Sequence, residues 1–269
     1  MRGDEDADGR EPLPLLHSRL IESPFVHGFS TRVGGVSAAP FDTLNMGARW
    51  GDVPGNVAEN RRRLLRAVGV ADPLYVARQV HGAAVVCVRA GDDPLAVARV
   101  EADAIVTGDA NVAVGIFVAD CIPALIVDPR TGAVAAAHAG WRGTVAGVLP
   151  AAVRALASEF GARPDDLRVA LGPAIGPCCF EVGAEVVGEF RAALGSAADV
   201  VMPSPRGTAG KWHVDLKAAN RLLLERAGVR PDAIDAGADC THHDRARFFS
   251  YRRDGETGQL MGVVARRDS

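Results

Sequence analysis

A cysteine and a histidine stand near opposite ends of one apolar segment, residues 117–143, FVADCIPALIVDPRTGAVAAAHAGWRG. The DPRTG sequence in its middle is typical of a hairpin loop, because proline fixes φ and glycine readily adopts a left-handed conformation. Pairing of residue 127 with residue 132 would place Cys121 opposite His138. Directly opposed residues have Cβ atoms about 5 Å apart. A thiolate and an imidazole at this separation can bind the same zinc ion.

A metal site needs a third donor, and His81 in RQVHGAAVV is the best remaining candidate. It lies between two predicted strands, and the glycine after it allows the backbone to turn. A Cys-His-His set with an open fourth position is typical of catalytic zinc. The alternative is that Cys121 is a small apolar core residue and that both histidines are hydrogen-bonded groups without a metal.

Helical and strand-like segments alternate around these residues. Apolar side chains recur at helical spacing, with a glycine after each segment, in predicted helices at 56–68, 144–160 and 215–227. Short β-rich runs predict strands at 75–78, 85–89, 104–107, 112–119, 124–127, 133–137, 168–171, 248–252 and 260–266. The segment 250–258 is predicted to form a hairpin around its DG turn. The mixed order indicates an α/β (mixed α+β) fold in which helices cover mixed sheets.

Composition and charge restrict the domain organisation and the class of function. Residues 1–12 are a predicted disordered acidic tail, and 13–269 form a single domain, because no repeat or linker divides them. A net charge of −3 argues against nucleic-acid binding, and no run approaches the about 18 apolar residues of a membrane helix. We therefore expect a cytoplasmic monomer with no obligatory protein partner. Its five cysteines, an odd number, do not indicate a disulfide framework.

Short motifs spread over most of the chain resemble, in content and order, the YfiH or laccase-domain family, often labelled polyphenol oxidase or peptidoglycan editing factor. The motifs are STRVGGVS (30–37), FDTLNMG (41–47), NVAENRRRL (56–64), RQVHG (78–82), ADAIVT (102–107), VADCIPALIVD (118–128), AAHAGWRG (136–143), GPAIGPCCFEVG (172–183) and FFSYRRDGETG (248–258). The resemblance implies one domain with layers in the order α-β-β-α and two packed mixed sheets. It also implies a zinc site formed by His81, Cys121 and His138.

The activity implied by the resemblance is that of a purine nucleoside phosphorylase that also deaminates adenosine. Its substrates would be phosphate and adenosine, inosine, guanosine or methylthioadenosine. Zinc with an open position can activate water for deamination. The H-x-E and P-C-x-x-C signature of the cytidine and tRNA-adenosine deaminases is absent, so another proton carrier is needed. Asp120, next to Cys121, is a candidate by position, although strand alternation would point it to the opposite face.

Phosphorolysis also requires an anion site. Gly140 and Arg142 in GWRG precede a predicted helix whose free N–H groups favour an anion near His138. Arg61 lies on the apolar face of the helix at 56–68, and phosphate is one partner for an inward arginine. A carboxylate or water is the alternative partner. Asn45 in FDTLNMG completes the predicted substrate- or phosphate-binding set.

Three other functions use the same residues. A copper-dependent polyphenol oxidase is disfavoured, because none of the seven histidines forms a His-x-His pair as in multicopper laccases. A cysteine hydrolase would use Cys121 as nucleophile and His138 as base, acting on a peptidoglycan precursor. A non-enzymatic module would use the zinc for structure alone.

The remaining thiols and histidines of the C-terminal half are predicted to be structural. Cys178 and Cys179 are adjacent, and a disulfide between neighbours is strained, so reduced packing is the favoured role. Cys240, His242 and His243 form a possible second metal set. Neighbours 242 and 243 point opposite ways on a strand, so a loop surface is favoured.

Overall fold

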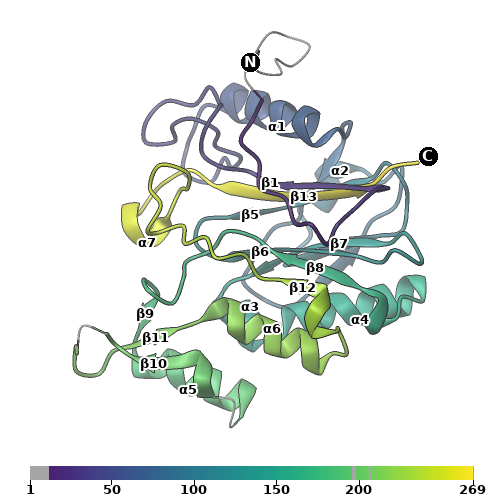
Figure 1. Ribbon diagram of the computed structural model, residues 1–269. Coiled ribbons are helices and arrows are strands. Elements are labelled where there is room, and N and C mark those ends of the chain that lie inside the picture. The colour runs from purple at the N-terminus through teal and green to yellow at the C-terminus, as the bar shows by residue number, and fades with distance from the viewer. Residues whose placement is uncertain (1–11, 196–197, 206, 269) are drawn as a thin grey trace, which may run out of the picture.

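Two mixed β-sheets pack face to face at the centre of the molecule, and helices cover their outer faces (Figure 1). The computed structural model describes residues 12–195, 198–205 and 207–268. The predicted acidic tail at 1–12 therefore lies outside the described residues, except for residue 12. The layered α-β-β-α arrangement with two mixed sheets is confirmed.

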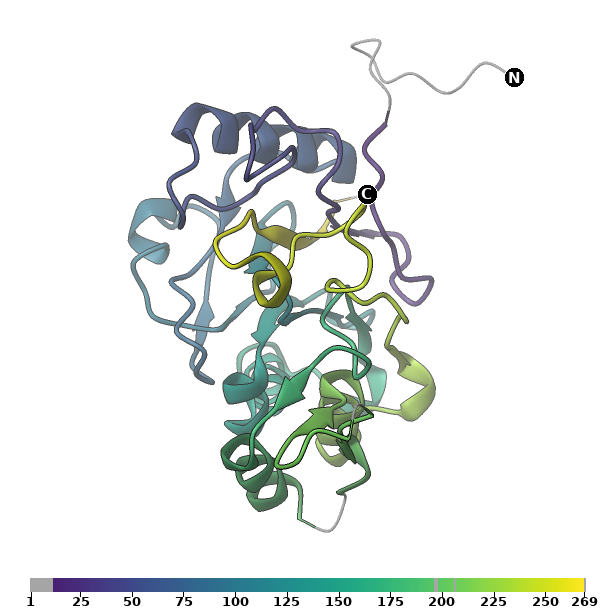
Figure 2. The ribbon, with the colours of Figure 1, turned by 90° about the vertical axis from the view of Figure 1, so that its left-hand side faces the viewer.

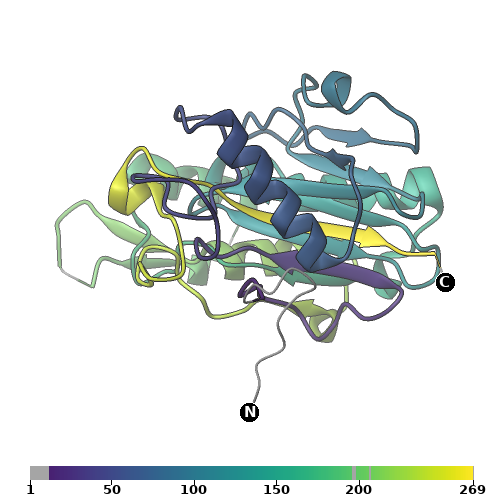
Figure 3. The same ribbon diagram turned by 90° about the horizontal axis from the view of Figure 1, so that it is seen from above.

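The first sheet has four strands in the order β1-β13-β5-β2. Its strands are β1 (Phe25–Phe29), β13 (Leu260–Arg266), β5 (Ala113–Val118) and β2 (Leu74–Tyr75). β13 is antiparallel to both β1 and β5, whereas β2 runs parallel to β5. Helix α1 (Pro54–Val68) lies over the outer face of this sheet, as the view from above shows (Figure 3).

The second sheet has six strands in the order β12-β8-β6-β7-β4-β3. Its strands are β12 (Ile234–Asp235), β8 (Arg168–Leu171), β6 (Ile122–Val127), β7 (Val134–Ala139), β4 (Ala104–Thr107) and β3 (Val85–Cys87). Its outer helices are α3 (Trp141–Val145), α4 (Val148–Phe160) and α6 (Leu216–Arg226). The predicted hairpin is thus the central antiparallel pair of this sheet, β6 and β7.

A third, small sheet lies beside these layers and was not predicted. It contains β10 (Val201–Pro203), β11 (Trp212–Val214) and β9 (Glu181–Val182), and helix α5 (Ala184–Leu194) packs near it (Figure 1). The other short elements are α2 (Pro94–Val97), α7 (Tyr251–Asp254) and three 3-10 turns at Pro164–Asp166, Ala198–Val200 and Pro231–Ala233. In the part of the chain that the structure describes, no helix has the length and apolar character needed to span a bilayer.

Strand β6 shows how an uninterrupted apolar run builds two cores at once. Ile122, Ala124 and Ile126 belong to the core beneath α3, α4 and α6. Leu125 and Val127 belong to the core between the two sheets. Successive strand side chains point to opposite faces, so a strand with both faces covered requires apolar residues throughout.

Several predicted elements differ from the structure by a few residues at their ends, and two predicted regions differ in kind. The helix predicted at 144–160 is divided into α3 and α4, because Gly147 adopts φ +79° between them. The strand and hairpin predicted at 248–258 are wrong: Tyr251–Asp254 is a short helix, and the Ser250 side chain accepts a hydrogen bond from the Arg253 N–H at its start. Serine is a favoured helix N-cap, and this local bond outweighs the β propensity of the preceding aromatic residues.

Candidate functional site

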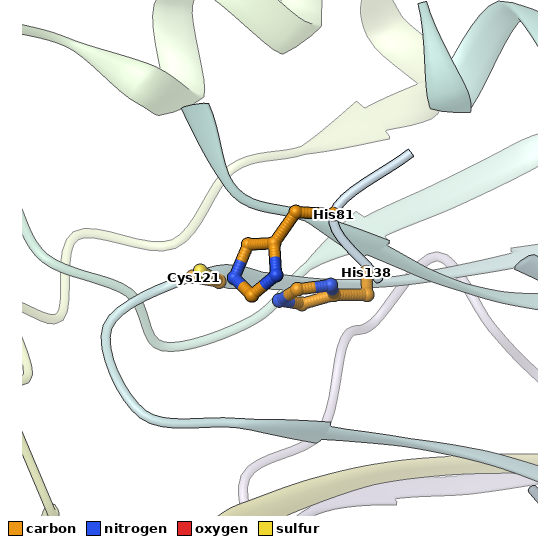
Figure 4. Close-up of side chains that lie close together, drawn as sticks. All are labelled: His81, Cys121 and His138. Carbon is orange, nitrogen blue, oxygen red and sulfur yellow. The ribbon is translucent and has the colours of Figure 1, made fainter. Parts of the chain in front are cut away.

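His81, Cys121 and His138 come together from three separate segments (Figure 4). One donor atom from each lies within 4.8 Å of the others. His81 is in the loop before β3, Cys121 immediately precedes β6, and His138 is near the end of β7. The ring centroids of the two histidines are 4.7 Å apart in an edge-to-face arrangement. One thiol and two imidazoles at this spacing match the donors that transition metals such as zinc and copper accept in proteins.

The hairpin register differs from the predicted one by two residues. Val127 pairs with Val134, and Pro123, not Cys121, pairs with His138. Asp128 causes the shift: its N–H donates to the Ala133 carbonyl, and its carboxylate accepts hydrogen bonds from the loop. A shift of two residues leaves every side chain on its original face. Cys121 and His138 are therefore diagonal neighbours on the face that also lines the core between the sheets.

Asp103 is fully buried and holds the His81 loop and the His138 ring by hydrogen bonds. Its carboxylate accepts hydrogen bonds from the backbone N–H groups of Val80 (3.1 Å), His81 (2.9 Å) and Gly82 (2.7 Å). Its Oδ1 also lies 2.8 Å from Nδ1 of His138. A carboxylate bonded to the far nitrogen of a ligating histidine fixes the ring orientation and leaves the other nitrogen for the metal.

Asp103 was not among the residues predicted for the site, although one signal in the sequence pointed to it. This aspartate stands directly before the apolar residues of β4 in the ADAIVT motif. A charged residue at the start of a fully buried strand needs partners, because burial of an unpaired charge is costly. Nothing in the sequence identifies the loop around His81 as that partner.

Two residues of the site have a left-handed backbone conformation that non-glycine residues seldom take. His81 has φ 63° and Asp120 has φ 85°. Such conformations cost on the order of 1–3 kcal/mol each and persist where the surroundings impose them. At His81 the hydrogen bonds to Asp103 impose this conformation, so the loop at residues 80–82 is held in one conformation.

The electrostatics among His81, Cys121 and His138 favour a thiolate at Cys121. Burial alone would raise the pKa of Cys121, but the charge of His138 and hydrogen bonds from His138 and His81 lower it to about 6. Burial alone would lower the pKa of His138, but Cys121 and Asp103 raise it to about 9. At a pH between these two pKa values, Cys121 is a thiolate and His138 is an imidazolium. When a metal displaces the imidazolium proton, both side chains are in the form that binds a metal.

Gly140 packs directly behind the donors. A Cβ at this position would lie 2.8 Å from Sγ of Cys121 and 3.1 Å from Cδ2 of His81. Glycine is therefore required here to leave room for both side chains. Helix α3, which begins after Gly140, has only five residues, so the extended helix expected behind the predicted anion site is not present.

A cavity of about 780 Å³ opens onto the three donors. It lies on the face that carries α7, which is turned toward the viewer in Figure 2. Five arginines and five aromatic residues line it, together with the site residues: Arg49, Arg61, Arg78, Arg142, Arg252, Trp50, Phe117, Trp141, Phe180 and Tyr251. The rings of Trp50 and Tyr251 are stacked with centroids 5.9 Å apart. The cavity therefore combines positive charge with flat apolar surfaces.

Asp120 lines the same cavity. Its carboxylate accepts hydrogen bonds from the Thr241 hydroxyl (2.6 Å) and from the Arg252 N–H (2.7 Å). The left-handed backbone at Asp120 ends the regular alternation before β6, so the expectation that it points to the opposite strand face does not apply. The structure thus brings Asp120 to the cavity that contains Cys121.

Arg61 and Arg142 also line the cavity. Arg61 is half-buried, its Nε donates to the Met46 carbonyl, and its guanidinium lies 4.9 Å from the Phe117 ring centroid. Burial lowers the pKa of Arg61. Among the described residues no carboxylate forms an ion pair with it. Arg142 is exposed and its guanidinium lies 4.3 Å from the ring centroid of Trp141.

Asn45 is not brought to the cavity. Its side chain is buried, donates to the Gly47 carbonyl and the Asp52 carboxylate, and accepts from the N–H groups of Gly47 and Gln259. Gly47 and Gln259 themselves line the cavity. Asn45 therefore fixes the wall of the cavity, and its amide has no group left for a substrate.

Comparison with known proteins gives matches over nearly the whole chain. Residues 26–267 match the family described as multi-copper polyphenol oxidoreductase laccase. A purine nucleoside phosphorylase of Pseudomonas aeruginosa is 46% identical over 235 residues, which cover 87% of this chain and 90% of that protein. A purine nucleoside phosphorylase of Streptomyces coelicolor is 44% identical, covering 88% and 93%. The crystal structure of YlmD from Geobacillus stearothermophilus superposes with a TM-score of 0.88 at 36% identity, covering 96% and 98%.

Proposed function

This chain belongs to the multi-copper polyphenol oxidoreductase laccase family, here the YfiH or laccase-domain type, and from that premise we propose that it is a zinc-dependent purine nucleoside phosphorylase. Relatives that are over 40% identical to it in the aligned region carry the name purine nucleoside phosphorylase. The observation that carries the proposal is a half-buried arginine without a carboxylate partner, Arg61, in the cavity that holds the thiol and imidazole donors. A buried cation in a substrate cavity calls for an anion, and phosphate satisfies it.

The phosphate is proposed to bind among the arginines of the cavity. Arg49, Arg61 and Arg142 all line it, and none pairs with a carboxylate within the described ranges. Guanidinium groups recognise phosphate through paired hydrogen bonds, and several of them in one cavity raise the local anion concentration. In the reaction a phosphate oxygen forms a bond to the sugar C1′, and the bond from C1′ to the purine nitrogen breaks.

The purine base is proposed to lie against the aromatic residues. Trp50 and Tyr251 stack on one another at the cavity wall with an interplanar angle of 13°, and Tyr251 is exposed, so an outer face of this pair is available to a base. Purines bind such surfaces by stacking, which contributes about 1–3 kcal/mol per base in nucleic-acid complexes. Stacking tolerates different ring substituents, in agreement with adenosine, inosine, guanosine and methylthioadenosine as alternative substrates.

His81, Cys121 and His138 would hold the zinc ion, and Asp103 would fix the His138 ring. When bound, zinc supplies a Lewis acid at the end of the cavity. Asp120 is placed to hold a proton, since its carboxylate faces the same cavity while Thr241 and Arg252 orient it. In phosphorolysis that proton would stabilise the departing base. In adenosine deamination, the second activity that we propose, it would assist loss of the amino group.

The test is phosphate-dependent release of free base from each nucleoside. We expect wild-type protein to release base only with phosphate present, and Cys121→Ala and His138→Ala to lose at least 100-fold in rate. Arg61→Ala should raise the KM for phosphate at least 10-fold, whereas Arg62→Ala, on the exposed side of the same helix, should not. Equal base release with and without phosphate, or unchanged rates in both ligand variants, would contradict the proposal.

The thiolate–imidazolium pair favours one alternative, a Cys-His hydrolase that acts on a peptidoglycan precursor. In it Cys121 would be the nucleophile, His138 the base and Asp103 the group that orients the base. The two functions respond differently to metal removal. Chelation followed by zinc addition should abolish and then restore phosphorolysis, whereas a hydrolase would stay active in chelator and lose activity when iodoacetamide alkylates Cys121.

A further inference from the structure

A second cluster of thiols with an imidazole lies outside the cavity, with Cys178, Cys179 and His243 mutually close and Cys240 beside Cys178. Cys178 and Cys179 lie in the turn before β9, and Cys240 and His243 lie in the segment before α7. The donor atoms of Cys178, Cys179 and His243 are within 4.8 Å of one another. The sulfur of Cys240 is 3.6 Å from that of Cys178.

The spacing of the sulfur atoms matches metal coordination. Two thiolates bound to one tetrahedral zinc at about 2.3 Å each lie about 3.8 Å apart. The sulfur atoms of Cys178 and Cys179 are 3.5 Å apart, and those of Cys178 and Cys240 are 3.6 Å apart. A disulfide would need a separation of about 2.0 Å. The thiols are thus already close to the separations that a shared ion imposes.

Local backbone structure explains why these side chains converge. Adjacent strand residues point to opposite faces, but Cys178 and Cys179 are in a turn closed by hydrogen bonds from the N–H groups of Cys179 and Phe180 to the Gly176 carbonyl. The Gly176 N–H in turn donates to the sulfur of Cys240 (3.2 Å). The turn therefore directs both of its thiols toward the segment that carries Cys240 and His243. The expectation that these residues serve only packing and a loop surface did not include this meeting of the two segments.

We propose that Cys178, Cys179, Cys240 and His243 form a second metal site, which binds a thiophilic divalent ion such as Zn²⁺. Three thiolates and one imidazole are a closed, four-ligand set of the kind found in structural zinc sites. The cluster is open to solvent at Cys178 and His243, so an ion can enter without rearrangement of the core.

The two segments that the ion would join both reach the cavity. Ile175 and Phe180, on either side of the turn, line it, and Thr241, next to Cys240, holds the Asp120 carboxylate. A metal at the second site would therefore fix the cavity wall and the orientation of Asp120 without touching substrate. This proposal is independent of the reaction catalysed in the cavity.

The test is zinc content, measured by mass spectrometry on protein that is purified under reducing conditions, saturated with zinc and gel-filtered. We expect wild-type protein to hold one more zinc ion per chain than the Cys178→Ser/Cys240→Ser variant. Cys121→Ala should retain the second ion, and Cys87→Ser, a cysteine outside both sites, should match the wild type. Equal zinc content in the wild type and the double variant would overturn the proposal.

A second measurement separates metal binding from a folding defect or a disulfide. Cobalt added to the Cys121→Ala protein should give intense thiolate-to-Co²⁺ absorption, because three thiols remain at the second site. Addition of His243→Ala to this variant should weaken cobalt binding at the second site at least 10-fold. Zinc should also slow amide hydrogen exchange at residues 175–180 and 240–243 in the Cys121→Ala protein. Absence of the cobalt absorption would overturn the proposal. A protein that loses two free thiols in air, and that still binds no metal after it has been reduced, would also overturn it.

Discussion

Replacement of Asp103 by asparagine should lower both the stability of the fold and the affinity for metal, because the Asp103 carboxylate holds the backbone of the His81 loop and also the His138 ring. The carboxylate accepts hydrogen bonds from three backbone N–H groups and from His138. Asparagine has one accepting oxygen and a donating NH2 group, so it can keep about two of these four bonds. Each lost hydrogen bond to a charged group is worth about 1.5–3 kcal/mol, which gives a loss of about 3–6 kcal/mol in the free energy of unfolding.

The expected measurements follow from that energy. Tm should fall on the order of 10 °C, since about 1 kcal/mol corresponds to about 2–4 °C in a chain of this size class. The zinc affinity, measured by competition with a chromophoric chelator, should fall about 10–100-fold, as for other partners of ligating histidines. Asp109→Asn is the control, because Asp109 also accepts a backbone N–H bond, from Ala90, but at an exposed position away from the ligands.

The pH dependence of stability gives an independent check on the same residue. Burial acts to raise the pKa of Asp103, but the hydrogen bonds from His138 and from the backbone of Gly82 and Val80 lower it overall. A carboxyl whose folded pKa is lowered stabilises the protein fully above its unfolded pKa of about 4, and this stability is lost as the pH falls through the folded pKa. Asp103→Asn should lack this acid-dependent loss. Wild-type zinc affinity together with wild-type Tm in the variant would refute the assigned role.

Three further predictions concern the ligands and the cavity. Gly140→Ala should lower the zinc affinity at least 10-fold, because the added Cβ meets the sulfur of Cys121. Gly188 has open space around it, so Gly188→Ala should leave the zinc affinity unchanged. Equal zinc affinities of the two variants would show that the proposed ligands can shift freely. In metal-free protein the thiolate absorbance of Cys121 should titrate near pH 6, and His138→Gln should raise its pKa; a midpoint near the ordinary thiol pKa of about 8.5 in the wild type would exclude the ion pair. Tyr251→Ala should raise the KM for nucleoside about 5–150-fold, because stacking of a base on an aromatic ring contributes about 1–3 kcal/mol, with little change in the KM for phosphate; an unchanged nucleoside KM would place the base elsewhere.

The three proposed metal donors could be gathered from the sequence even though the predicted strand pairing was wrong. The strands at 104–107, 168–171 and 260–266 were predicted with their observed bounds, because buried strands give uninterrupted apolar runs. The hairpin was displaced by two residues, and a shift by an even number preserves the face of each side chain. Cys121 and His138 thus remained neighbours despite the wrong register.

What the sequence did not provide depends on contacts between distant segments. Asp103 receives its role from a loop more than twenty residues away, and no local pattern marks that pairing. Asn45 was placed with the binding residues by its motif, but it does not line the cavity, and its buried hydrogen bonds instead hold Gly47 and Gln259 in the cavity wall. Helix α7 is too short for helical periodicity to identify it, since four residues make barely one turn.

The position of β13 between β1 and β5 determines when this protein can complete its fold during synthesis. β1 is made early, but its hydrogen-bonding partner is β13, which follows every other described strand in the chain. Until residues 260–266 leave the ribosome, β1 and β5 expose unpaired edges, and such edges promote association between nascent chains. The six-stranded sheet contains no residue beyond Asp235, so the hairpin with Cys121 and His138 can form first. The proposed metal ligands would then be assembled on the ribosome well before Tyr251, Arg252 and Gln259 close the cavity.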